Sequence, residues 1–249
     1  MTQKELILSF SEVIGVIGVL MLLGVSTRYR FVPIRFKYNN RERNTALIIF
    51  SLVFAAALLV FQGPLAAVLQ GSFSSFSLTS GTALLPRLAA GILALIPTVS
   101  ALIIRQQPLR STGWDAKRLN GGLRAALVLV FLIIILRGLM VPLATGQLNS
   151  QFTALGFWML IALAEETVFR GFLQLRLASW LNDKQGLVLT ALMYTIYQIP
   201  RIALNPDGLL VGTVFTLVQG LLLGWIMLKT GHAAAPALYR AVSEWVRML

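Results

Sequence analysis

Long apolar stretches separated by short loops are the feature that most limits the folds open to this chain. Of its 249 residues, 57% are hydrophobic and only 12% are Asp, Glu, Lys or Arg, which is outside the range of ordinary soluble domains. Backbone that faces lipid must satisfy its own hydrogen bonds, as a helix does. We therefore expect an all-α integral membrane protein, a single membrane domain over residues 1–249 that forms a bundle of about eight transmembrane helices.

The apolar stretches predict where these helices lie. They cover about residues 6–25, 45–69, 83–104, 123–144, 152–180, 187–204, 209–228, and 232 to the C-terminus. Pro64 is expected to kink the second helix. Gly220 and Gly224 are four residues apart, a spacing that favours close helix packing. The last stretch carries Arg240 and Glu244, and we expect it either to span the membrane or to lie partly in its interface.

The positive charge of the chain is concentrated in two loops. The net charge is +12, and the loops hold Arg28, Arg30, Arg35, Lys37, Arg41 and Arg43, then Arg105, Arg110, Lys117, Arg118 and Arg124. This clustering indicates that the basic residues orient the chain in the membrane rather than bind nucleic acid. The predicted partner is therefore the lipid bilayer and not a nucleic acid. Basic loops stay in the cytoplasm. We expect both termini outside, in a bacterial inner (plasma) membrane.

Few residues are suited to bind a metal. Cysteine is absent and histidine occurs once, at position 232, so thiolate sites are excluded and a zinc site would need several carboxylates. No metal and no other cofactor is predicted. The first apolar stretch lacks a cleavage site of small residues, which indicates a retained helix rather than a signal peptide.

Two glutamates and an arginine lie in the middle of the fifth apolar stretch. Charges at that depth are costly and usually mark a site facing the bundle interior. Glu166 and Arg170 are four residues apart and can pair on one helix face. The side chain of Glu165 is rotated about 100° from that of Glu166 around the helix axis and is expected to point towards a neighbouring helix. Arg137 is a further candidate counter-ion. Glu12 is expected either to face a partner helix or, as we favour, to lie near the interface.

The pattern of Glu165, Glu166, Phe169, Arg170 and Gly171 resembles the first motif of the CAAX-protease and bacteriocin-processing family of intramembrane proteases. The resemblance covers about residues 123–249, which leaves three extra helices in residues 1–122. It implies a glutamate that activates water, with histidines and an asparagine that position the water and stabilise the oxyanion.

The two later motifs are altered. Tyr194 is followed four residues later by Gln198, where the family has histidine. After Pro236, Arg240 stands in place of a second histidine and Glu244 in place of asparagine. Gln198 cannot take up a proton at neutral pH, and Arg240 is permanently charged but can clamp a carboxylate.

Two functions stay open. The candidate site residues are Glu165, Glu166, Arg170, Gln198, Arg240 and Glu244. The first function is a peptidase that works through Glu165 on a membrane-bound peptide. The second, which we favour, is a non-catalytic protein that acts as a subunit, scaffold or assembly factor with other membrane-protein subunits. His232 precedes the motif position and is expected to lie at a helix start near the interface.

Overall fold

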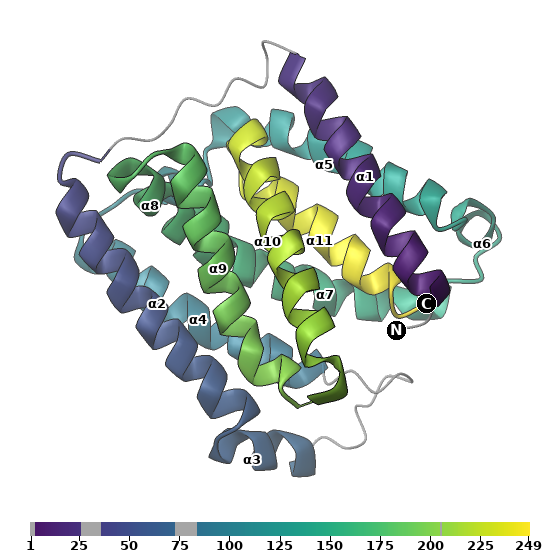
Figure 1. The fold of residues 1–249 in the computed structure, drawn as a ribbon, viewed down its shortest axis with the longest axis horizontal. Helices are drawn as coiled ribbons and strands as arrows, with labels where there is room; N and C mark the ends of the chain where they lie inside the picture. The colour runs from purple at the N-terminus through teal and green to yellow at the C-terminus, as the bar shows by residue number, and fades with distance from the viewer. Residues whose placement is uncertain (1–2, 26–35, 73–83, 205) are drawn as a thin grey trace.

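A computed structural model describes residues 3–25, 36–72, 84–204 and 206–249 (Figure 1). Arg28, Arg30, Arg35 and most of the predicted uncharged link 71–82 lie outside the described residues. The longer helices are α1 (Gln3–Val25), α2 (Asn39–Phe61), α4 (Leu84–Ile104), α5 (Ala116–Leu136), α7 (Phe152–Glu166), α9 (Asp183–Ile202), α10 (Leu209–Thr230) and α11 (Ala234–Val246). The shorter elements are α3 (Pro64–Ser72), η3 (Leu109–Thr112), α6 (Met140–Ala144), η4 (Asn149–Gln151), η5 (Thr167–Gln174), α8 (Leu175–Trp180) and η6 (Pro206–Gly208).

The predicted helical membrane bundle is confirmed. Six helical stretches in the described part of the chain are long and apolar enough to cross a membrane: Ile7–Val25, Asn39–Phe61, Leu84–Ile104, Leu109–Leu136, Phe152–Trp180 and Leu209–Thr230. The prediction named about eight, and α9 and α11 are the two that do not meet these criteria. Helix α11 has 13 residues, about 20 Å of helix, which is short of a bilayer core of about 30 Å. Nearly all of α11 is buried within the bundle, and whether it spans the membrane or lies partly in the interface stays a prediction.

Two predicted helices end earlier than expected because of local breakers. Helix α2 stops at Phe61, and Pro64 begins the separate helix α3 rather than kinking α2. Proline suits the first position of a helix because its missing N–H has no intrahelical partner there. The predicted helix 123–144 is divided after Leu136, where Gly138 has a positive φ of 66°.

The span formed by α7, η5 and α8 lies between two apolar cores. The first core joins α7 with α1, α5, α10 and α11, and the second joins η5 and α8 with α2, α4 and α9. Figure 1 shows α2 and α4 on the left and α1 and α5 on the right, with α10 and α11 drawn between them. The predicted charged motif therefore lies where the two cores meet.

Glycines let the central helices approach closely. A Cβ on Gly171, in the π-helical segment η5, would lie 2.2 Å from the carbonyl oxygen of Thr112, so only glycine fits there. Gly220 faces the backbone of Ala191 on α9, and Gly224 faces Leu187 one turn away. The predicted close packing at these two glycines is confirmed.

Candidate functional site

The charged motif occupies the end of α7 and the start of η5, where the helix changes from α to π geometry. Glu165 is 2% exposed, and Glu166 and Arg170 are 0% exposed. Arg240 projects from α11 and is also 0% exposed. These four residues form what we call the central cluster.

Arg240 binds both glutamates of the central cluster. Its Nη1 donates to Oε1 of Glu166 over 2.9 Å, and its Nη2 donates to Oε2 of Glu165. The Nε of Arg170 lies 3.2 Å from the other carboxylate oxygen of Glu166. The predicted pair of Glu166 and Arg170 forms, and Arg240 reaches Glu165 from the last helix. Two carboxylates and two guanidiniums thus balance in charge, which offsets much of the desolvation that burial imposes.

Neutral side chains from α9 complete the surroundings of Glu165. Gln198 donates from Nε2 to Oε2 of Glu165 over 3.0 Å, and Tyr197 donates its hydroxyl to Oε1 over 3.5 Å. The guanidiniums of Arg170 and Arg240 lie 4.4 and 5.1 Å from the centre of the Tyr194 ring. Such contacts favour a cation where water is excluded.

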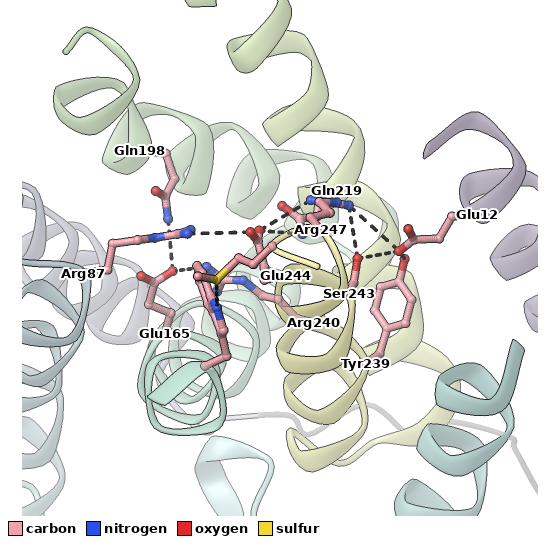
Figure 2. Close-up of polar contacts among 12 residues, drawn as sticks. Glu12, Arg87, Glu165, Gln198, Gln219, Tyr239, Arg240, Ser243, Glu244 and Arg247 are labelled. Carbon is pink, nitrogen blue, oxygen red and sulfur yellow. Dashed lines mark hydrogen bonds and ion pairs between the residues drawn. The ribbon is translucent and has the colours of Figure 1, made fainter. Parts of the chain in front are cut away.

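Glu244 lies apart from the central cluster. The carboxylate of Glu244 lies 3.6 Å from a guanidinium nitrogen of Arg87 on α4 and 3.6 Å from one of Arg247, which directly follows α11. Gln219 of α10 donates a hydrogen bond to the same carboxylate over 3.3 Å. Figure 2 shows Arg87 and Arg247 approaching Glu244 from opposite sides. Glu244 is therefore not part of the central cluster that Arg240 forms with Glu165 and Glu166.

Two expectations about other charged residues are wrong. Glu12 is 2% exposed and faces the bundle interior rather than the interface. It accepts hydrogen bonds from Tyr239 and Ser243 of α11 (Figure 2). It also pairs with Arg137 at 3.1 Å. Arg137 is thus the partner of Glu12 and not a counter-ion for the central cluster.

Other parts of the polar interior were not predicted from the sequence. Arg87 lies near the start of α4 and pairs with Glu244. Glu42 is 3% exposed and binds Arg105 and Arg176 at the ends of α4 and α8. A sequence feature that could have indicated these ion pairs is an arginine within one or two turns of the end of an apolar helix, because a buried arginine there needs an acidic partner.

His232 lies in the turn before α11, as expected for a residue at a helix start. Its Nδ1 accepts a hydrogen bond from the N–H of Ala234, and its ring meets the edge of Trp114 at 5.2 Å between centroids. His232 is 2% exposed and is therefore buried within the bundle. Burial lowers the pKa of His232, which Asp115 partly counteracts.

The central cluster can hold charge in place, but its groups are poorly placed for proton transfer. Both oxygens of Glu165 have protein partners, and neither Gln198 nor Arg240 can exchange a proton near neutral pH. Across the described ranges, no three His, Asp or Glu side chains converge as a metal site would require.

Comparison with known proteins agrees with the sequence resemblance over part of the chain. Residues 147–246 match the family model described as type II CAAX prenyl endopeptidase Rce1-like. This range contains the whole central cluster together with Gln198 and Glu244. No curated protein and no solved structure gives a match. The resemblance is therefore confirmed for residues 147–246, and the chain is an integral membrane protein that is CAAX-protease-like over this range.

Proposed function

We propose that this chain is a non-catalytic CAAX-protease-like membrane protein that serves as a subunit, scaffold or assembly factor of a membrane complex. The observation that carries the proposal is the position of Arg240, whose guanidinium binds Glu165 and Glu166 at once. An arginine in this position fills the space beside the carboxylates that an attacking water would need.

Proton chemistry supports the same conclusion. A general base must lie within hydrogen-bond reach of the water that it deprotonates. Glu165 instead accepts from Arg240, Gln198 and Tyr197. Under this proposal the charged residues are retained because they hold α7, η5, α9 and α11 together.

A peptidase that works through Glu165 is the second candidate. It is favoured by the match of residues 147–246 to a family of endopeptidases, and by the convergence of Gln198 and Arg240 on the glutamate. Both side chains are donors that could orient a substrate carbonyl or stabilise an oxyanion. This mechanism requires Arg240 to leave Glu165 when a peptide binds.

A peptidase assay separates the two candidates. The purified protein and its Glu165→Gln variant are incubated with prenylated CAAX peptides in detergent and in lipid vesicles, and products are identified by mass spectrometry. Non-catalytic function predicts no cleavage by either protein. Cleavage by the native protein that is lost in Glu165→Gln would establish the peptidase.

Restoring the family residues is a stricter test. The triple variant Gln198→His, Arg240→His and Glu244→Asn replaces the three altered positions. If these substitutions alone removed activity, the folded triple variant should cleave peptides that the native protein leaves intact. The Gln198→His and Glu244→Asn double variant, which keeps Arg240, is the matched control and should stay inactive.

We also propose that the protein resides in a bacterial inner membrane with its basic loops in the cytoplasm and its partners among other membrane proteins. The positive-inside rule supports this orientation. Reporter fusions at the two termini test it, because both should report an external location. Affinity purification from mildly solubilised membranes should recover the native chain with stoichiometric membrane subunits, and a chain that always purifies alone would contradict the subunit role.

A further inference from the structure

The polar interior contains more arginine than glutamate. Among the described residues it holds Arg87, Arg137, Arg170, Arg201, Arg240 and Arg247, together with Glu12, Glu165, Glu166 and Glu244. Six guanidiniums and four carboxylates leave an excess of two positive charges in this group. Excess charge is costly in a membrane protein wherever burial keeps water from it.

The excess is confined to one side of the interior. The central cluster is balanced, with Glu165 and Glu166 bound to Arg170 and Arg240. The pair of Glu12 and Arg137 is balanced as well. The remaining groups are Glu244 and the three arginines Arg87, Arg201 and Arg247, which we call the arginine triad.

The arginines of the triad come from three different parts of the chain, and two of them contact the same carboxylate. Arg87 lies in the first turn of α4 and Arg247 directly follows α11, and both approach Glu244 to 3.6 Å. Arg201 lies in the last turn of α9, and its main charged neighbours are Arg87, which repels it, and Glu244, which attracts it. Two guanidiniums thus contact one carboxylate, and the third, that of Arg201, lies near enough to Arg87 and Glu244 to interact with them electrostatically.

The donors of the triad are incompletely used. Arg87 is 6% exposed, and within the described part of the chain its Nε has no hydrogen-bond partner. Its ion pair with Glu244, at 3.6 Å, is long for a hydrogen bond. Arg201 is partly buried and donates to the neutral Oε1 of Gln198. The Nε of Arg247 likewise lacks a partner among the described residues, although its Nη groups contact Ser243 and Glu244. The triad therefore keeps charge and some donors available for an acceptor.

Few acids in the chain remain that could compensate the triad. The sequence has nine Asp and Glu residues, and Glu42, Asp115 and Asp183 belong to other parts of the fold. The segment 73–83, which precedes α4, contains no acid at all. Only Glu5 and Asp207 are left, and their side chains are outside the described residues.

We propose that the arginine triad is a binding site for a phosphate-type oxoanion, either free inorganic phosphate or the headgroup of an anionic phospholipid. Planar guanidiniums bind such oxygens through paired charge-assisted hydrogen bonds. All three arginines lie within about a turn of a helix end. The site does not depend on whether the chain is a peptidase.

Thermal unfolding of the purified protein tests this assignment. The protein is held in a neutral detergent without phosphate, and unfolding is followed by tryptophan fluorescence as phosphate is added at constant ionic strength. At about a hundredfold excess over its dissociation constant, phosphate should raise the midpoint by about 5 to 10 °C. Arg201→Gln and Arg87→Gln should abolish the response, whereas Arg124→Gln, which removes an exposed charge on α5, should keep it. Because Arg87 also packs on the Trp158 ring, the Arg201 variant is the decisive one if Arg87→Gln does not fold.

A lipid arm separates the two sources of phosphate. The same measurement in bicelles compares phosphatidylglycerol with phosphatidylcholine. Stabilisation by phosphatidylglycerol that requires Arg201 assigns the site to a lipid headgroup, and stabilisation by inorganic phosphate alone assigns it to the free ion. Absence of both effects, or equal effects in native protein and Arg201→Gln, would overturn the proposal. So would a loss of stability in Asp207→Asn with no phosphate response in the native protein, because Asp207 would then be the missing counter-charge.

Discussion

Replacement of Arg240 by glutamine is the most informative perturbation of this fold. The change removes a fully buried guanidinium and leaves Glu165 and Glu166 in place. Glu166 keeps Arg170 at 3.2 Å, and Glu165 keeps the amide of Gln198 at 3.0 Å. One negative charge then remains inside the bundle without a cation, where burial penalises it most.

The expected destabilisation follows from these contacts. Removing one partner of a buried ion pair typically costs about 3–5 kcal/mol. Although Arg240 contacts two carboxylates, we expect Arg240→Gln to cost the free energy of one broken ion pair rather than two, because Arg170 continues to neutralise Glu166. For a chain of this size the loss corresponds to a fall of about 6–20 °C in the unfolding midpoint. Arg240→Lys keeps the charge but cannot bridge both carboxylates, so it should lie between the native protein and Arg240→Gln.

A double-mutant cycle isolates the contact itself. Glu165→Gln combined with Arg240→Gln removes one charge of each sign, so the double variant should be more stable than the sum of the single losses predicts, by about 1–3 kcal/mol. Unfolding in mixed detergent micelles gives the four free energies, and Arg124→Gln is the surface control, expected within about 0.5 kcal/mol of the native protein.

The sign of the Glu165→Gln effect distinguishes a structural site from a catalytic one. Catalytic groups are often held at the expense of stability, so their removal tends to stabilise a protein. If Arg240 serves mainly to bind Glu165, then Glu165→Gln should destabilise the fold. A stabilising Glu165→Gln, or an Arg240→Gln loss below about 1 kcal/mol, would refute the account of the central cluster as a set of buried structural ion pairs.

Three further outcomes follow from the packing and from burial. Gly171→Ala should prevent normal folding, because the added Cβ would lie 2.2 Å from the Thr112 carbonyl oxygen. Gly156→Ala, whose Cβ would meet open space, should instead raise helix stability by about 1 kcal/mol. Expression levels and unfolding midpoints measure both effects. Glu12→Gln should lower stability by about 2–4 kcal/mol in the same unfolding assay, because it leaves a buried guanidinium unpaired. Since burial lowers the pKa of His232, the folded state favours the neutral ring, and stability present above about pH 6.5 should decline as the pH falls below it, a decline that His232→Asn should remove.

Several features of this protein follow from the sequence because they depend on short-range chemistry. Apolar length and the demand for internal backbone hydrogen bonds predict the helical membrane bundle. Spacing along one helix predicts the pair of Glu166 and Arg170. The alignment of Arg240 with a family histidine places it opposite Glu165, and the structure brings the two together.

Other features depend on which helices become neighbours, and only the tertiary structure decides that. The sequence does not show that α1 packs on α11, so the burial of Glu12 beside Tyr239 and Ser243 could not be predicted. For the same reason Arg137 was assigned to the wrong glutamate. The arginine triad is the clearest case, because the fold brings Arg87 and Arg247, which are 160 residues apart in the sequence, to one carboxylate. Charge balance in a buried site is a property of three-dimensional neighbours, whereas the sequence records only which charges exist.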